Sequence, residues 1–101
     1  MQVQCKETSD GLLVTLDGQL DDTSASSLPS RLSTLCEGKK QGNILIDLAA
    51  CHVDSSLGYG ALVAFRLSPA VLGKQVSICN ALPDVASGMR ALRFEKLFKL
   101  I

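Results

Sequence analysis

The fold is decided by one stretch, 44-ILIDLAACHVDSSLGYGAL-62, in which an apolar run gives way to polar residues and then to a second apolar segment. Residues 44–48 form a nearly continuous apolar run, which is typical of a strand buried on both faces. From Ser55 or Ser56 to about Leu67, apolar residues recur at the spacing of a helix. A buried strand followed by a helix is the building unit of α/β proteins.

The residues before this unit predict two strands. Val3 and Cys5 alternate with polar residues, as in a short edge strand. A turn-like 9-SDG-11 leads into 12-LLVTLDG-18, which is apolar and β-branched. We expect this second strand to end at Gly18.

A helix is expected between the second and third strands, because three leucines recur there at helical spacing: Leu28, Leu32 and Leu35. Asp22 or Thr23 is predicted to cap it. Pro29 is expected either to delay the regular helix until about Leu28 or to kink it. The helix should end within 37-EGKKQGN-43, where two glycines bracket two lysines.

The remainder predicts one more strand, a short helix and a final strand. The strand is 75-QVSIC-79, and the helix lies within 80-NALPDVASGMRAL-92, with Pro83 near its first turn. The final strand is expected within 94-FEKLFKLI-101. The order is therefore β-β-α-β-α-β-α-β, which predicts one α/β domain over residues 1–101 with a mixed sheet and helices packed mainly on one face.

Composition excludes several classes of function. Ten basic and ten acidic residues balance, so no basic surplus exists to bind nucleic acid or an anionic membrane. There is no Trp and only one Tyr on which bases could stack. No apolar run approaches the roughly 18 residues that span a bilayer, so no membrane insertion is expected. The stretch 1-MQVQCKETSDG-11 lacks the features of a signal peptide, and we expect a cytoplasmic protein.

The four cysteines are widely scattered, with no C-x-x-C pair: Cys5, Cys36, Cys51 and Cys79. In a reducing cytosol we interpret them as small buried hydrophobic residues. One histidine does not complete an ordinary zinc site with cysteines so dispersed. We therefore expect no metal and no cofactor.

The adjacent serines at 55 and 56 admit three interpretations. They could cap the helix that follows, since Ser is a preferred N-cap residue. They could include a nucleophile, but the G-x-S-x-G elbow is absent because Asp54 stands where Ser56 would need a glycine. His52 adjoins them in sequence, which does not by itself build a catalytic relay. The third interpretation is phosphorylation, because a phosphate at a helix N-terminus meets the positive end of the helix dipole. We expect no enzyme activity.

Three pieces of the sequence resemble a known family. They are 16-LDGQLDDTSASSL-28, with Gly18, Leu20 and Asp21 at matching places, the stretch 44–62 quoted above, and 92-LRFEKLFKLI-101. The whole chain is similar to the STAS domains of bacterial anti-sigma-factor antagonists and related modules. The resemblance implies a small sheet with helices packed against it, as the pattern alone predicts.

The resemblance also implies a partner-switching function. In the family, a serine kinase that is itself the anti-sigma factor phosphorylates a Ser or Thr in a D-S-S-G loop, and a PPM-type phosphatase removes the phosphate. Only the unphosphorylated antagonist binds the kinase and frees the sigma factor. Transferred here, this makes Ser56 the expected phosphorylation site, with Ser55 as second choice. The expected partner-binding residues are Asp21, Asp54, Ser55, Ser56, Leu57, Gly58 and Tyr59.

The sequence departs from the family pattern at one point. Matching D-S-S onto Asp54 to Ser56 leaves one extra residue before Gly60. A gapless match over residues 47–62 instead places Leu57 at the acceptor position. Leucine cannot accept phosphate, so the second match predicts a constitutive STAS binding module, such as a subunit of a lipid-transport complex or a signalling scaffold.

Overall fold

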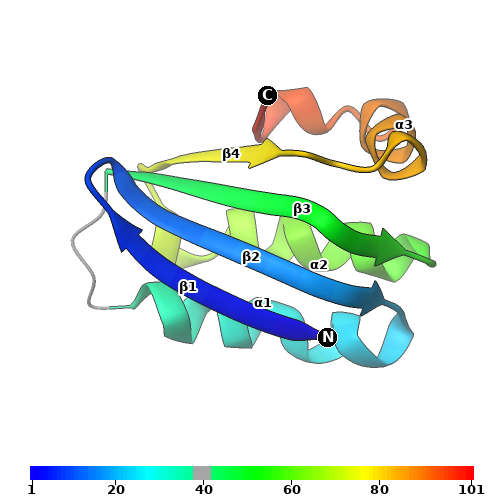
Figure 1. Ribbon diagram of the computed structural model, residues 1–101, viewed down its shortest axis with the longest axis horizontal. Helices are drawn as coiled ribbons and strands as arrows, with labels where there is room; N and C mark the ends of the chain where they lie inside the picture. The colour runs from blue at the N-terminus through cyan, green and yellow to red at the C-terminus, as the bar shows by residue number, and fades with distance from the viewer. Residues whose placement is uncertain (38–41) are drawn as a thin grey trace.

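The computed structural model describes residues 1–37 and 42–101, and these form a mixed sheet with helices on one side of it (Figure 1). Among the described residues, the elements in chain order are β1 (Gln2–Thr8), β2 (Gly11–Leu20), α1 (Asp22–Cys36), β3 (Asn43–Val53), α2 (Ser56–Arg66), the 3₁₀ turn η1 (Pro69–Val71), β4 (Gln75–Cys79), α3 (Pro83–Ala91), the 3₁₀ turn η2 (Phe94–Lys96) and β5 (Lys99–Leu100). The predicted order of strands and helices is confirmed.

The strands lie in the sheet in sequence order, β1-β2-β3-β4-β5. β1 is the predicted edge strand and pairs antiparallel with β2, whereas β2, β3, β4 and β5 run parallel to their neighbours. The carboxyl ends of β2 and β3 therefore coincide, with Leu20 opposite Val53. This register places the starts of the next two helices beside each other.

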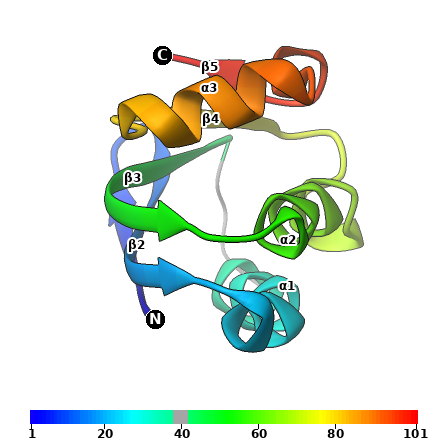
Figure 2. The ribbon, with the colours of Figure 1, turned by 90° about the vertical axis from the view of Figure 1, so that its right-hand side faces the viewer.

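The core lies between the sheet and the pair α1 and α2, which run side by side behind one sheet face (Figures 1 and 2). Alternate residues of each central strand point into this core, as the period of a strand requires. They are Leu12, Val14 and Leu16 of β2, Ile44, Ile46 and Leu48 of β3, and Val76 and Ile78 of β4. The helices contribute Leu28, Leu32, Leu62 and Phe65.

Helix α1 begins earlier than the sequence predicts and continues through Pro29. The missing N–H and the ring of a proline inside a helix cost about 3 kcal/mol. Burial of Leu28 and Leu32 on the inward side offsets this cost. Part of the predicted helix stop, residues 38–41, lies outside the described residues.

Two strand predictions need correction. β2 does not end at Gly18 but runs to Leu20, because pairing with β3 continues through Gly18, whose φ of 122° is readily adopted by glycine. The expected final strand is mostly a 3₁₀ turn: Phe94 and Phe98 stack in the core, and pairing is left to the two residues of β5.

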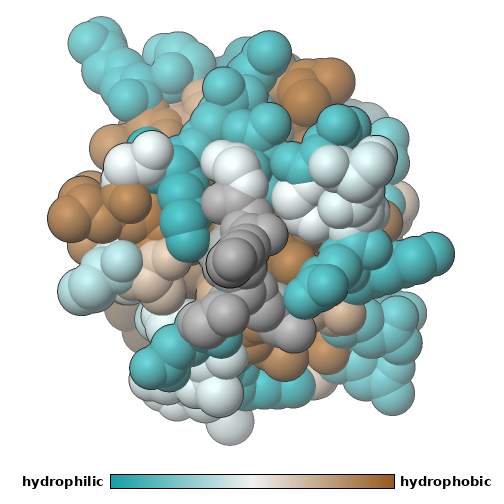
Figure 3. Space-filling view, turned by 90° about the vertical axis from the view of Figure 1, so that its left-hand side faces the viewer, coloured by the Kyte–Doolittle hydropathy of each residue, from teal (hydrophilic) through white to brown (hydrophobic). Residues whose placement is uncertain are grey.

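The cysteines partly follow the prediction. Cys36 and Cys51 are buried, while Cys5 and Cys79 are half-buried. Burial raises the pKa of the Cys51 thiol to about 11. No helix in residues 1–37 or 42–101 is both long and apolar enough to cross a bilayer. On the face at the hairpin end of the sheet, hydrophobic surface is broken into patches by polar side chains (Figure 3).

Candidate functional site

The candidate site lies where β2 and β3 end and the two neighbouring helices begin. β2 ends at Leu20 and is followed by α1, and β3 ends at Val53 and is followed by α2. Figure 2 shows both helices starting at the same end of the sheet. In α/β folds this carboxyl end of parallel strands is the usual place for binding sites.

Asp21 is the N-cap of α1, which corrects the prediction of Asp22 or Thr23. The Asp21 carboxylate accepts a hydrogen bond from the Ser24 backbone N–H at 2.9 Å, and the Asp21 N–H donates to the Ser24 hydroxyl at 2.9 Å. This is a reciprocal capping box. The Ser24 hydroxyl also donates to the Gln19 carbonyl at 2.9 Å. Hydrogen bonds from Ser24 hold the pKa of the Asp21 carboxyl below its ordinary value of 3.8.

Asp54 fixes the start of the loop before α2. Its backbone N–H donates to the Leu20 carbonyl at 3.1 Å, and its carboxylate accepts a hydrogen bond from the Gln19 side-chain amide. Gln19 thus contacts both loops, through its carbonyl on the α1 side and its amide on the α2 side. The two loops are held together by the last residues of β2.

Ser55 occupies the N-cap position of α2, but its side chain forms no capping hydrogen bond. Its hydroxyl oxygen is buried and has no hydrogen-bond partner among residues 1–37 and 42–101, whereas its carbonyl accepts a hydrogen bond from the Gly58 N–H at 3.1 Å. The capping interpretation is therefore wrong for this hydroxyl. His52 is exposed.

Ser56 is the first residue of α2 and is exposed. Leu57 follows it and is 58% exposed, one of several large apolar residues on the surface of the described chain. The two adjacent serines therefore differ: the hydroxyl of Ser55 points into the protein, and Ser56 stands on the surface next to an exposed leucine.

Gly58 lets the start of α2 approach the sheet closely. A Cβ at this position would lie 2.9 Å from Val53 Cγ1 and 3.1 Å from the Leu20 carbonyl oxygen. Gly60 differs, because a Cβ there would meet nothing within 4 Å. Gly58 is buried, so it shapes the site through its backbone position.

A groove of about 450 Å³ separates α1 and α2 and opens beside Leu57. Its walls are mostly small and apolar, with one carboxylate, and comprise Asp22, Ala25, Ser26, Pro29, Leu57, Gly60, Ala61 and Ala64. The surface around the helix starts therefore combines carboxylates, an exposed serine and an apolar groove. Such a surface is suited to binding another protein.

Tyr59 turns away from this groove. It is half-buried, and its ring meets Phe94 edge to face with a centroid distance of 5.9 Å. Its hydroxyl lies against Gly88 of α3, where a Cβ would be only 2.2 Å away. Burial and the nearby Asp84 raise the pKa of the Tyr59 hydroxyl. Tyr59 thus joins α2 to α3.

A sequence profile for the STAS domain matches residues 2–101. The chain belongs to the STAS domain family. The resemblance inferred from three sequence pieces is thereby confirmed, and the match extends over nearly the whole chain.

Solved structures share the fold of this STAS domain. The anti-sigma factor antagonist SpoIIAA in its unphosphorylated form superposes with a TM-score of 0.69 at 16% identity, covering 99% of this chain and 87% of that one. The Bacillus cell fate determinant SpoIIAA in its phosphorylated form gives 0.69 at 14%, covering 99% and 91%. A variant of RsbS from Moorella thermoacetica gives 0.76 at 18%, covering 100% and 86%. At these identities the likeness concerns the fold.

The STAS fold gathers most of the predicted site residues and separates one. Asp21, Asp54, Ser55 and Ser56 lie on the two loops that Gln19 links, and Leu57 and Gly58 follow in the first turn of α2. Tyr59 lies on the other side of α2, against α3. Its role in partner binding stays a prediction.

Sequence reasoning missed the contribution of α1 to this STAS surface. The spacing of Leu57, Gly60, Ala61 and Ala64 on one face of α2 was a usable signal, because small residues leave room between packed helices. The Gln19 contacts had no such signal, since they depend on the register of β2 against β3.

Proposed function

We propose that this STAS domain is an anti-sigma-factor antagonist in a partner-switching pathway of transcription control. Unphosphorylated, it binds a serine-kinase anti-sigma factor in the cytoplasm with the surface at the starts of α1 and α2. Phosphorylation of Ser56 releases the kinase, and a PPM-type phosphatase restores binding.

The observation that carries the proposal is the exposed Ser56 at the first position of α2. A kinase must reach the hydroxyl oxygen of its substrate residue, and the Ser55 oxygen is buried. The structure therefore favours Ser56 over Ser55 as the phosphate acceptor. A further support is the relative SpoIIAA, whose structure is known in both unphosphorylated and phosphorylated forms.

Electrostatics explain how one phosphate would change binding without unfolding the domain. At a helix N-terminus, backbone N–H groups and the helix dipole stabilise an added phosphate. The phosphate brings a charge of about −2 to a surface that already carries the carboxylates of Asp21, Asp22 and Asp54. A partner that accepts those carboxylates would face a much more negative surface and lose affinity.

The first experiment is intact-mass measurement of the protein purified from its native host, with fragmentation across residues 44–66. One phosphate on Ser56 is expected under some growth conditions, and none on Ser55. Loss of the phosphate after incubation with a PPM-type phosphatase would support the reverse step. Absence of phosphate under all growth conditions, with other phosphoproteins of the host detected, would contradict the proposal.

The second experiment measures binding of the Ser56→Asp variant to the serine-kinase anti-sigma factors of the host by calorimetry. We expect weaker binding than for the unphosphorylated protein, with an unchanged thermal unfolding midpoint. Ser87→Asp, which adds the same charge at an exposed position of α3, is the matched control and should bind normally. We expect no catalysis by the domain itself, so a fluorophosphonate probe should leave Ser56 unlabelled.

A second candidate function is that of a constitutive STAS module, such as a subunit of a lipid-transport complex or a signalling scaffold. The exposed Leu57 favours it, because an apolar contact at the helix start needs no switch. In that case Ser56→Asp would leave a stable complex unchanged, whereas Leu57→Ala would weaken it.

A further inference from the structure

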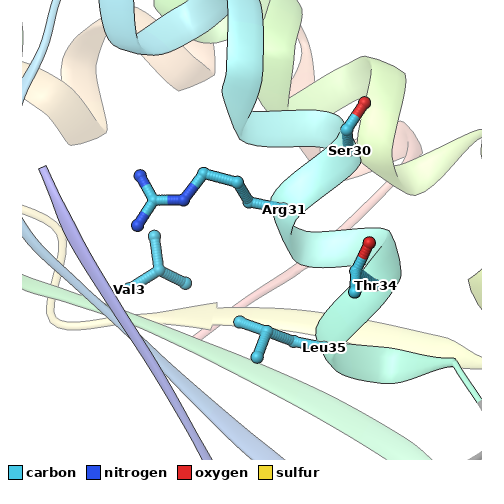
Figure 4. Close-up of a pocket in the computed structure, with 5 residues that line it drawn as sticks. All are labelled: Val3, Ser30, Arg31, Thr34 and Leu35. Atoms are coloured by element: carbon cyan, nitrogen blue, oxygen red, sulfur yellow. The ribbon is translucent and has the colours of Figure 1, made fainter.

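A cavity of about 370 Å³ lies between β1 and α1, away from the helix starts at which the proposed switch acts. Its lining residues come from the edge strand and one helix: Val3, Ser30, Arg31, Thr34 and Leu35. Figure 4 shows Val3 and Leu35 pointing into the space from opposite sides, with the guanidinium of Arg31 reaching from α1 toward Val3. The cavity therefore has apolar side chains on two sides, hydroxyl residues on α1 and a cation at one end.

The cavity borders the open edge of the sheet. β1 is the outermost strand of the described sheet and pairs with β2 on one side only. On the other side, every second residue of an edge strand directs its N–H and C=O groups away from the sheet. Such an edge can accept an added strand, whose backbone supplies affinity and whose alternate side chains enter pockets. The cavity between β1 and α1 lies on the helix side of that edge.

The position of α1 indicates that the open edge of β1 pairs with a lone extended segment rather than with a second copy of the domain. In Figure 1, α1 lies along the open side of β1 and extends past the sheet edge. An antiparallel copy added edge to edge would carry its own α1 into the same space. A single strand carries no helix of its own and so avoids this clash.

The position of Arg31 indicates that such a segment ends in a free carboxylate. Its Nη1–H donates to the Met1 carbonyl at 3.3 Å, so its side chain crosses the groove at the amino end of β1. A strand antiparallel to β1 brings its carboxyl end to this place. A guanidinium presents a planar fork that matches a carboxylate. A chain that stops there pairs its terminal carboxylate with Arg31, whereas a continuing chain must pass the Arg31–Met1 contact.

We propose that the groove between β1 and α1 binds the free carboxyl terminus of an extended peptide. The peptide adds antiparallel to β1, places an apolar last side chain between Val3 and Leu35, and pairs its terminal carboxylate with Arg31. This site is separate from the helix starts and does not depend on Ser56.

The test is fluorescence polarisation with labelled hexapeptides that alternate Thr and Val and end in Ala, Val, Leu, Ile or Phe with a free carboxylate. At least one should bind, and its carboxyl-terminal amide should bind about tenfold or more weakly, as expected for loss of a charge-assisted hydrogen bond. Arg31→Ala should weaken the free acid by a similar factor and leave the amide unaffected. Arg90→Ala, at an exposed arginine of α3, is the matched control and should bind normally.

Amide chemical shifts locate the binding. Titration with the tightest peptide should move the resonances of residues 2–8 and 30–35 and leave those of residues 54–58 in place. Equal binding of acid and amide would overturn the proposal, as would shifts confined to the helix starts. Failure of the entire peptide panel to bind would overturn it as well, as would concentration-dependent dimerisation of the domain through β1.

Discussion

Gly58 offers the sharpest test of how the site is built, because Gly60 in the same helix is a matched control. At Gly58 an added Cβ would lie 2.9 Å from Val53 Cγ1, 3.0 Å from Leu20 Cγ and 3.1 Å from the Leu20 carbonyl oxygen. Carbon atoms pack best at about 3.5–4.0 Å, so α2 must move away from Leu20 and Val53, or these strand ends must move away from it. At Gly60 the same Cβ would enter open space.

Two opposing contributions set how much each Gly→Ala substitution changes the free energy of unfolding. Replacing Gly by Ala inside a helix stabilises the folded state by up to about 1 kcal/mol. Forcing a methyl group into a packed contact costs about 1–3 kcal/mol. Gly60→Ala gains the first contribution alone and should raise the free energy of unfolding by about 0.5–1 kcal/mol. Gly58→Ala should lower it by about 1 kcal/mol, since the steric contribution exceeds the helix propensity gain.

The measurement is urea unfolding followed by circular dichroism, with the thermal midpoint as a second readout. The two variants should differ by roughly 2 kcal/mol, which corresponds to roughly 8–16 °C between their midpoints in a domain of this size. If Gly58→Ala is as stable as Gly60→Ala, the close approach of α2 to β2 does not exist as described. Gly58 would then not be the residue that positions the start of α2.

Three further predictions concern other parts of the molecule. Folding lowers the pKa of the Asp21 carboxyl, so its charged form adds stability above pH 3.8, and this stability is lost as the pH falls through the folded-state pKa. In urea unfolding, the stability of Asp21→Asn should therefore approach that of the wild type on acidification. A difference between the two that stays constant with pH would contradict the capping role of Asp21. Gly88→Ala should lower the free energy of unfolding by about 1 kcal/mol or more by pushing on the Tyr59 hydroxyl, and Tyr59→Phe should recover part of that loss in a double-variant cycle. Cys51, buried and with a pKa of about 11, should resist iodoacetamide at pH 8 until the protein unfolds, and peptide mapping that finds it alkylated as fast as Cys79 would show a more open core.

The order of elements could be predicted from the sequence because local pattern and tertiary burial agree in most of them. Residues 75–79 alternate and are flanked by turn residues, and β4 has those bounds. Pro83 stands at the first position of α3, where its fixed φ suits a helix start. In such segments the local signal and the packed structure require the same conformation.

The errors occurred where distant contacts outweighed local preference. Pro29 argued for a broken helix, but the buried leucines on both sides of it keep α1 continuous. The apolar residues 94–101 argued for a strand, but Phe94 and Phe98 stack on each other in the core, and the chain turns at residues 94–96 to bury both. The buried hydroxyl of Ser55 has no local signature at all, since it depends on how the loop is held by β2.

The loop before α2 is fixed at two points that lie close together. Asp54 is tied to the end of β2 by two hydrogen bonds, and Gly58 is packed against the same strand end. Residues 55–57 span the interval between them. Ser56 and Leu57 are exposed within this interval, so their side chains can change while the two fixed points hold the loop in place. If the proposed partner binds this surface, chimaeras that swap Ser56 and Leu57 between STAS domains should change partner specificity and leave the fold intact.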